Sequence, residues 1–156
     1  MLRPQLEELA RTFTRGNAGQ IEKLYLQDIV LHSTYRRVAD ELVLKGGTAL
    51  HKLYNLDRFS EDLDFTAVKR VDFARLLESV ERDLKSFGTQ AEKSRQEEDA
   101  DSFKARLGIR GPLYTGSELS LSYLRIEVNK RAGAEKPIVK RYAPTSRTYR
   151  PSKCWP

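Results

Sequence analysis

Two aspartates with one residue between them are the first candidates for chemistry in this sequence. Asp62 and Asp64 belong to the stretch Asp-Leu-Asp-Phe-Thr at residues 62–66, in which acidic and apolar residues alternate with the period of a β-strand. Side chains two positions apart on a strand point to the same side of a sheet. Two carboxylates held this close repel each other, and a hard divalent cation such as Mg²⁺, which takes oxygen ligands, relieves that repulsion. A hydrated polar strand face is the alternative, but aspartate is disfavoured in strands, so we favour a metal site.

A pair of glycines lies a short distance upstream. Gly46 and Gly47 follow the apolar run 41–45 and precede Thr48, which opens a short helical stretch. Backbone amides at a helix N-terminus can bind a phosphate, so the turn is a candidate phosphate cradle, and a plain strand-to-helix turn is the alternative. Lys45 precedes the glycines and no Gly-Lys-Ser/Thr follows them, so the sequence does not match a P-loop ATPase.

A third carboxylate comes from the alternating stretch 119–128. Glu127 lies near its end, on the strand face that also carries Arg125. Beside the aspartate pair, Glu127 would complete a site for two Mg²⁺ ions, or for Mn²⁺ in their place. The alternative is a surface acid that pairs with Arg125 or Lys130.

The elements that must position these residues follow from the spacing of apolar residues. This spacing predicts helices over 4–14, 20–39, 49–54 and 71–87, strands over 41–45, 62–66, 103–109 and 119–128, and an exposed charged connection over 90–101. This order of helices and strands predicts an α+β or α/β protein with a small mixed sheet flanked by helices.

The length and charge narrow the class of protein. The chain has 156 residues, which fits one domain, and its 28 Lys and Arg against 22 Asp and Glu give a net charge of +6. A nucleotide, a nucleic acid or another polyanion is therefore an expected partner. The excess lies in 130–153, where eight basic residues face only Glu135 and where Tyr142 and Tyr149 are interleaved, with Trp155 just beyond. This stretch is either a hydrated basic tail or a segment that stacks on nucleic-acid bases.

Other classes are excluded by composition. No apolar run is long enough to cross a membrane, and the start of the chain lacks a secretory apolar stretch. A single cysteine, Cys154, cannot form an internal disulfide, and one cysteine with two histidines cannot hold a structural zinc ion. We therefore expect a soluble, cytoplasmic protein with no membrane partner.

Two motifs, in this order, carry a resemblance to a known family. Leu-Lys-Gly-Gly-Thr-Ala-Leu occupies residues 44–50, and Arg-Phe-Ser-Glu-Asp-Leu-Asp-Phe occupies residues 58–65. Together they resemble the signature of the nucleotidyltransferase AbiEii/AbiGii toxin family, part of the DNA polymerase β-like nucleotidyltransferase superfamily. More loosely, the resemblance extends over residues 22–137. It implies that the small mixed sheet and its helices form a nucleotidyltransferase-like fold.

The resemblance also implies roles for individual residues. In the family, the positions that hold the triphosphate of an NTP match Gly46, Gly47, Thr48 and Ser60. The positions that bind magnesium match Asp62 and Asp64. The third acid of the family matches Glu127 more loosely. Lys45 and Arg58 also match the signature. A basic residue beside acids is as often a structural ion pair as a phosphate ligand, so both readings stay open for these two.

The activity implied by the resemblance is magnesium-dependent transfer of a nucleoside monophosphate from an NTP to an RNA, such as tRNA, or to a protein acceptor. Such a protein would be the toxin of a toxin–antitoxin pair, with a cognate antitoxin as partner. Family members usually continue into a helical half, and nothing after Pro137 resembles it. We therefore expect a nucleotidyltransferase-like domain over 1–137 and a basic, irregular segment over 138–156.

Two other functions remain open. One is a catalytically inactive or truncated nucleotidyltransferase fold that binds nucleotide, RNA or a protein partner. The other is a small DNA- or RNA-binding domain unrelated to transferases, which would explain the charge of +6 but not the aspartate pair.

Overall fold

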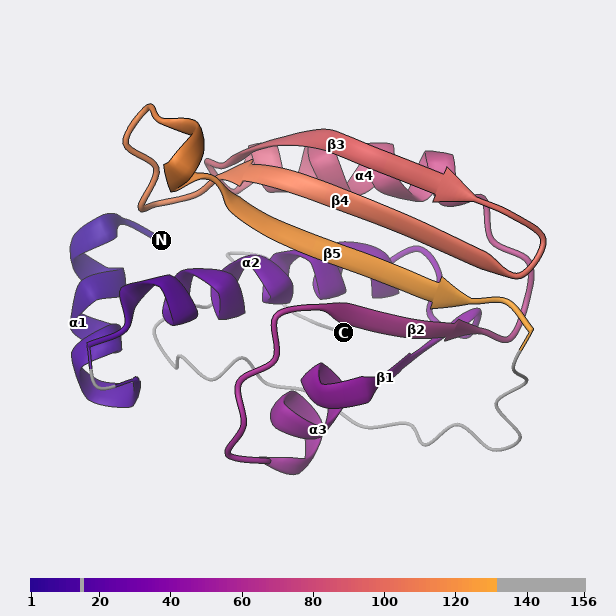
Figure 1. The fold of residues 1–156 in the computed structure, drawn as a ribbon, viewed down its shortest axis with the longest axis horizontal. Coiled ribbons are helices and arrows are strands. Elements are labelled where there is room, and N and C mark those ends of the chain that lie inside the picture. The colour runs from indigo at the N-terminus through magenta and orange to yellow at the C-terminus, as the bar shows by residue number, and fades with distance from the viewer. Residues whose placement is uncertain (15, 132–156) are drawn as a thin grey trace.

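A single sheet with the two long helices on one face forms most of the described chain, which a computed structural model places over residues 1–14 and 16–131 (Figure 1). The helices are α1 (Arg3–Phe13), α2 (Ala18–Tyr35), α3 (Gly46–Tyr54) and α4 (Phe73–Ser86), and the strands are β1 (Leu42–Lys45), β2 (Leu63–Ala67), β3 (Gln90–Glu98), β4 (Ser102–Arg110) and β5 (Ser122–Asn129). A 3₁₀ turn over Glu118–Ser120 precedes the last strand.

The five strands run in the order β1-β2-β5-β4-β3. The pairing of β2 with β5 is parallel, and the other three pairings are antiparallel. The sheet is therefore mixed, as the sequence predicts, and the mixed α and β class is confirmed. The parallel pair sets two strands that are distant in sequence side by side.

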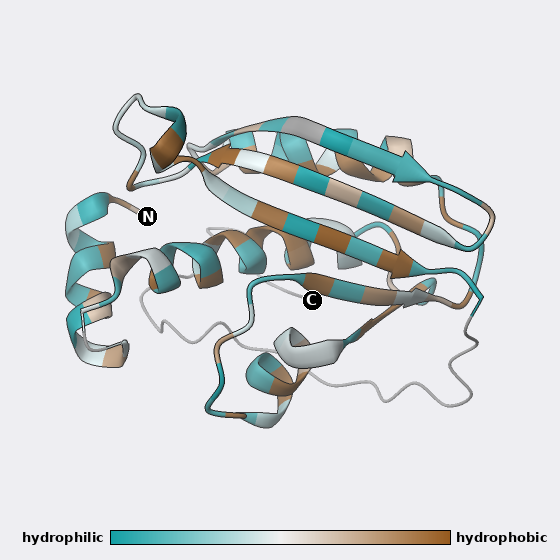
Figure 2. Cartoon of the chain, in the orientation of Figure 1, coloured by the Kyte–Doolittle hydropathy of each residue, from teal (hydrophilic) through white to brown (hydrophobic). Residues whose placement is uncertain are grey.

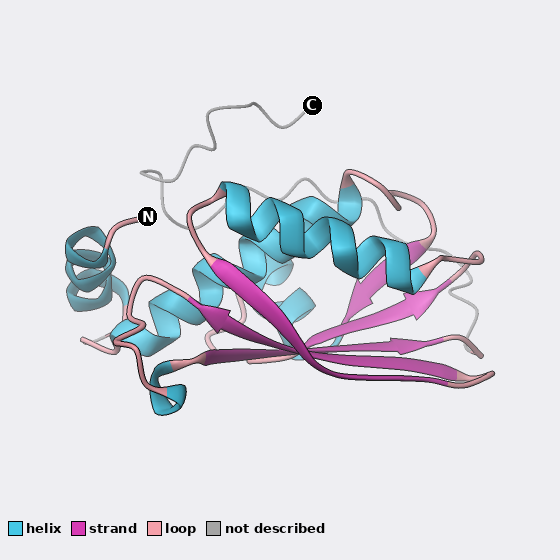
Figure 3. Cartoon of the chain, turned by 90° about the horizontal axis from the view of Figure 1, so that it is seen from above, coloured by secondary structure: helices cyan, strands magenta, loops and turns pink. Residues whose placement is uncertain are grey.

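Helices α2 and α4 cover one face of the sheet and leave the other face open (Figure 3). Apolar and polar residues alternate along β4 and β5 (Figure 2), and the apolar set points toward these helices. The rings of Phe73 on α4 and Phe103 on β4 stack with centroids 4.4 Å apart in this core. Polar side chains of the central strands consequently gather on the open face, where a ligand can reach them.

Both long helices begin at a side chain that caps their first turn. The Asn17 side chain accepts a hydrogen bond from the amide of Gln20 at the start of α2, and Asp72 caps α4 in the same way. Gly88, with a φ of +79°, follows the end of α4 and adopts a conformation that favours glycine. Predicted and observed ends of these two helices differ by one to four residues.

The short helix α3 is fixed to α2 by a buried ion pair. Lys52 Nζ lies 2.7 Å from Asp28 Oδ1, and both side chains are almost entirely shielded from solvent. Losing one partner of such a pair leaves an uncompensated buried charge, which is strongly destabilising. This contact holds the helix that follows the glycine turn in place. Near the N-terminal end of α2, Leu6 and Ala10 of α1 form a small separate core with Ile21.

Two predicted elements are wrong. The expected connection over 90–101 is largely an edge strand, β3, which pairs with β4 from Gln90 to Glu98. Its charged side chains hide the strand pattern because an edge strand needs no apolar face of its own and is protected from aggregation by charge. The strand expected from residue 119 begins instead at Ser122, because Leu119 is 99% exposed in the 3₁₀ turn.

The expected basic segment over 138–156 and the end of the predicted domain, 132–137, lie outside the described residues. Within the described ranges, none of the helices combines the length and the apolar character that crossing a membrane requires.

Candidate active site

The register of three adjacent strands brings the predicted acids together. Asp64 on β2 lies opposite Lys45 of β1 on one side and opposite Glu127 of β5 on the other. Leu63, between the two aspartates, is fully buried, whereas Asp62 and Asp64 are both partly exposed. The two aspartates therefore face the open side of the sheet, as their spacing predicts.

The glycine turn packs directly on this acidic cluster. Gly46 has a φ of +71°, in the left-handed region, and a Cβ built on it would lie 2.6 Å from Oδ2 of Asp64. A Cβ on Gly47 would lie 2.8 Å from the Ser60 hydroxyl oxygen. Any larger residue would displace these side chains, so the two glycines permit the close approach of the turn to Asp64 and Ser60.

Helix α3 begins at this turn with its first amides uncapped. Lys45 occupies the N-cap position and makes no side-chain capping hydrogen bond. The first amides of a helix have no acceptor within the helix, and the helix dipole favours an anion there. The turn can therefore bind a phosphate beside Asp64.

The Thr48 hydroxyl is used within the fold. Thr48 is 1% exposed, and its Oγ1 donates to the carbonyl oxygen of Asp62 at 2.5 Å. In this arrangement the Thr48 side chain fixes the chain at Asp62, and a phosphate at this turn would be bound by backbone amides.

Burial and like charges act together on Asp64. Burial raises the pKa of its carboxyl group, and the nearby carboxylates of Glu127 and Asp62 raise it further, against the opposing effects of Lys45 and Arg125. A carboxylate whose pKa is raised by neighbouring acids on an open face is typical of a functional site.

Arg125 supplies a positive charge to this acidic cluster. Its Nε donates to Oδ1 of Asp62 at 3.0 Å. Within the described part of the chain, no three His, Cys, Asp or Glu side chains lie close enough together to hold one metal ion, and Asp62 is paired with Arg125. The oxygen donors of Asp62, Asp64 and Glu127 nevertheless fit a hard divalent cation in kind, and they would ligate one if Asp62 left Arg125.

The predicted partners of Glu127 are engaged elsewhere. Arg125 pairs with Asp62, and Lys130 pairs with Glu98 at 2.6 Å. Over residues 16–131 Glu127 makes no ion pair, so the alternative of a surface acid paired with Arg125 or Lys130 is wrong.

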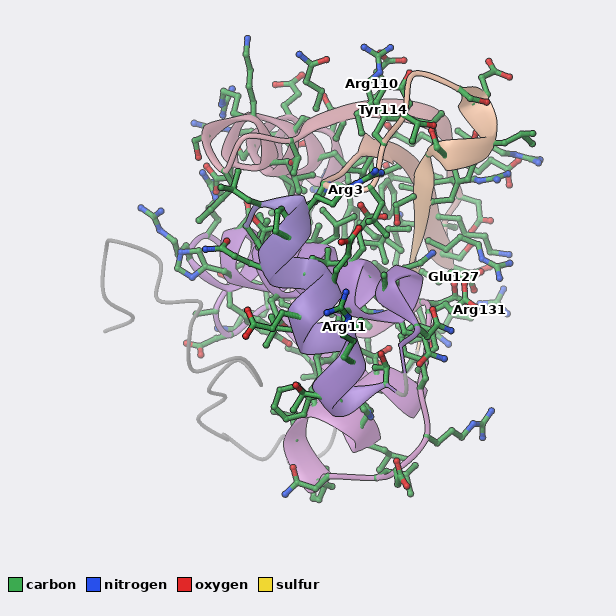
Figure 4. All side chains as sticks on the ribbon, turned by 90° about the vertical axis from the view of Figure 1, so that its left-hand side faces the viewer. Arg3, Arg11, Arg110, Tyr114, Glu127 and Arg131 are labelled. Atoms are coloured by element: carbon green, nitrogen blue, oxygen red, sulfur yellow. The ribbon has the colours of Figure 1, made fainter. Side chains whose placement is uncertain are left out.

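A groove of about 350 Å³ runs along the open face at the acids. Its charged lining consists of Asp64, Glu127 and Asp101 together with Lys45, Lys104 and Arg131, of which Arg131 pairs with Asp101. Figure 4 shows Glu127 and Arg131 on the side of the molecule away from α4. A groove with carboxylates and cations side by side suits a ligand that combines a metal ion with a polyanion.

The predicted residues are not all equally close to this groove. Lys45 lines it, and Ser60 lies against the glycine turn. Arg58 is exposed in the loop before Ser60 and does not line the groove. Sequence reasoning missed Gln27 on α2, whose side-chain amide donates a hydrogen bond to the carbonyl oxygen of Ser60. The sequence gives little signal for it, because Gln27 stands beside Asp28 in a helical stretch that mixes polar and apolar residues.

The family is decided by a match that spans the candidate site. A family model described as the nucleotidyl transferase AbiEii toxin of type IV toxin–antitoxin systems matches residues 32–150, which include every predicted site residue. The chain belongs to the AbiEii family. A search of curated proteins finds no match to this AbiEii-family chain.

Solved structures agree with the fold of this AbiEii-family chain. One is a candidate nucleotidyltransferase from H. pylori, with 23% identity and a TM-score of 0.54 over 72% of this chain and 47% of that one. Another is JHP933 from Helicobacter pylori, with 26% identity and a TM-score of 0.52 over 73% of this chain and 47% of that one. The chain thus spans about half the length of the structures it matches.

Proposed function

We propose that this AbiEii-family chain is a magnesium-dependent nucleotidyltransferase domain that moves a nucleoside monophosphate from an NTP to an acceptor hydroxyl. The observation that carries the proposal is the register of β2 and β5, which sets Asp64 opposite Glu127 beside the Gly46 turn. Carboxylates for a metal ion and amides for a phosphate are then adjacent on one open face. Both are needed by an enzyme that acts on a metal-bound triphosphate.

In the proposed reaction the acceptor oxygen forms a bond to the α-phosphorus of the NTP. The bond between that phosphorus and the oxygen of the leaving pyrophosphate breaks, and the hydroxyl proton leaves to water. Divalent cations, when bound, lower the pKa of the hydroxyl and neutralise the triphosphate. Asp62 and Asp64 would hold the metal ion that accompanies the triphosphate, and Glu127 would complete the site for the ion that activates the acceptor.

Basic side chains of the open face support a polyanionic ligand. Lys104 on β4 lines the same groove as Asp64, and Lys45 lies opposite Asp64 on β1. Arg131 after β5 also lines the groove, where it pairs with Asp101 and would have to exchange that carboxylate for the ligand. These cations would contact the triphosphate or the backbone of an RNA acceptor such as tRNA. A protein acceptor remains the other candidate. The family membership also supports a role as a toxin with a cognate antitoxin as partner.

A second candidate is an inactive fold that binds nucleotide, RNA or a protein partner. The ion pair between Arg125 and Asp62 favours it, because a cationic side chain on one of the three acids competes with a metal ion. In that case nucleotide would bind at the Gly46 turn without being consumed.

Incubation of the protein with each α-labelled NTP, Mg²⁺, total RNA and total protein separates the two candidates. The enzyme transfers label to an acceptor and releases pyrophosphate, and Asp64→Asn abolishes both. Binding of labelled NTP with no label transferred and no pyrophosphate released supports the inactive fold.

A further inference from the structure

Three successive carbonyl groups just before β2 are held by side chains from outside the strand. Gln27 Nε2 donates to the carbonyl oxygens of Ser60 at 2.9 Å and of Glu61 at 3.1 Å, and Thr48 Oγ1 holds the carbonyl of Asp62. β2 begins only at Leu63, so the sheet does not fix this segment. Side-chain donors take the place of strand pairing here.

Gln27 makes these contacts from a buried position. The residue is 0% exposed on α2, and among the residues described its Oε1 has no hydrogen-bond partner. An unsatisfied acceptor in the core is costly, so an apolar residue of the same size would suit the core better. Ser60 is half-buried and Glu61 is exposed, so the two carbonyls that Gln27 contacts belong to a segment at the edge of the core. The amide therefore fixes the position of residues 60–62, which an apolar residue of the same size could not do.

Lys23, one turn earlier on α2, holds the same segment from a second point. Its Nζ lies 3.4 Å from Glu61 Oε2 and also donates to the carbonyl oxygen of Tyr123 on β5. Residues four apart on a helix lie on one face. One face of α2 thus connects the segment that leads to Asp62 with the strand that carries Glu127.

We propose that Gln27 is a positioning residue of the candidate site, acting through the carbonyls of Ser60 and Glu61. By fixing this segment it sets the Ser60 hydroxyl against Gly47 and the Asp62 carboxylate beside Asp64. Its effect on catalysis rests on the proposed function, but its effect on residues 60–62 does not.

Hydrogen exchange measured by mass spectrometry tests the placement directly. Gln27→Leu removes both donors and Gln27→Glu replaces them with acceptors, so we expect faster exchange in residues 58–64 of both variants relative to α4. Lys23→Met, which leaves Gln27 in place, gives a smaller change in the same direction. Ile29→Val, a change at another core residue of α2, is the control and leaves the relative exchange of 58–64 unchanged.

Steady-state kinetics with NTP and Mg²⁺ supplies the second readout. We expect kcat of Gln27→Leu to fall about tenfold, equivalent to ~1.4 kcal/mol, with less change in the KM for NTP and no change in Ile29→Val. If Gln27→Leu matches Ile29→Val in exchange, or in kcat with an active wild type, the positioning role is overturned. A wild type that transfers no nucleotide contradicts the proposed function alone, and the exchange data then decide the positioning role.

Discussion

Arg125 of β5 donates from its Nε to Oδ1 of Asp62 at 3.0 Å, across the junction of the two parallel strands. The pair is at the surface, with the Asp62 side chain 36% exposed and that of Arg125 62% exposed. One of the three candidate acids is thus partly neutralised, whereas Glu127 makes no ion pair among the described residues, although Lys104 lies opposite it on β4. A metal ion at this cluster must compete with Arg125 for Asp62.

Removing Arg125 is expected to strengthen metal binding. Arg125→Gln frees Asp62, and because exposed pairs contribute only ~0–1 kcal/mol, the dissociation constant for Mn²⁺ should fall by up to about fivefold. Mn²⁺ titration followed by electron paramagnetic resonance, without NTP, measures this constant. Arg106→Gln is the matched control, because Arg106 lies opposite Arg125 on β4 with its guanidinium 3.9 Å from the centre of the Tyr123 ring. Equal changes in the two variants would attribute the effect to net charge alone.

Asp64→Asn is expected to stabilise the metal-free protein at neutral pH. Burial, Glu127 and Asp62 all raise the pKa of Asp64, so the fold favours its protonated form. This contribution to stability is fully present below the ordinary aspartate pKa and is lost as pH rises through the raised pKa of the folded state. Urea unfolding across that pH range should therefore show a smaller loss of stability with rising pH in Asp64→Asn than in the wild type.

Magnesium should make the wild type more stable than Asp64→Asn. Excess Mg²⁺ raises the Tm of the wild type but not that of Asp64→Asn, because only the carboxylate attracts the ion. In the wild type the Mg²⁺ effect should weaken as pH falls through the raised pKa of Asp64, since protonation competes with the metal. A lower Tm for Asp64→Asn without metal would mean that Asp64 is a structural residue.

Glu127→Gln should reduce transfer much more than it reduces NTP binding. Glu127 would complete the site for the metal ion that activates the acceptor, whereas the glycine turn and the aspartates hold the nucleotide. The rate at saturating NTP is compared with equilibrium NTP binding for the same variant. Glu97→Gln, which removes an acid from the edge strand β3, is the charge-matched control and should leave both unchanged. Normal turnover in Glu127→Gln would exclude a role in the reaction.

Gly46→Ala should disrupt both the fold and the site, and Gly88→Ala separates the two effects. Both glycines have positive φ, so each alanine carries a left-handed backbone cost of about 1–2 kcal/mol in unfolding free energy. Only at Gly46 does the new Cβ meet Asp64 Oδ2, whereas at Gly88 nothing lies within 4 Å. We expect a larger loss of unfolding free energy and loss of the Mg²⁺ response in Gly46→Ala alone. Equal behaviour of the two variants would show that the contact with Asp64 is unimportant.

The sequence predicts the elements whose apolar residues recur at a regular spacing. Both long helices follow from this spacing, although α2 is buried on all sides from Tyr25 to Thr34 and only α4 keeps an exposed face. The grouping of Asp62 and Asp64 follows from the period of a strand. β3 escapes prediction because an edge strand paired with only one neighbour can be charged on both faces.

The contacts within the site are harder to predict because they join distant segments. The alternation of β5 places Arg125 and Glu127 on one face, but it cannot show that Arg125 reaches an acid at the start of β2 rather than Glu127. Gln27 is polar in a buried helix, and only the folded chain shows that its amide faces two carbonyls from residues 60 and 61. Periodicity indicates which face a residue occupies, and the partner depends on the register of nonlocal strands.

The parallel pairing of β2 with β5 also determines when the site can exist. Leu63 meets Ile126 in this register, so closing the pair means bringing together segments separated by α4, β3, β4 and the 3₁₀ turn. Contacts of such long sequence separation form late, because the loop between them must lose its freedom first. During synthesis the ribosome would have released β2 well before β5 emerged, and a chain interrupted in between would carry the glycine turn and both aspartates without Glu127. A growing chain of this protein would therefore stay without its complete acidic cluster until almost the whole sheet had been made.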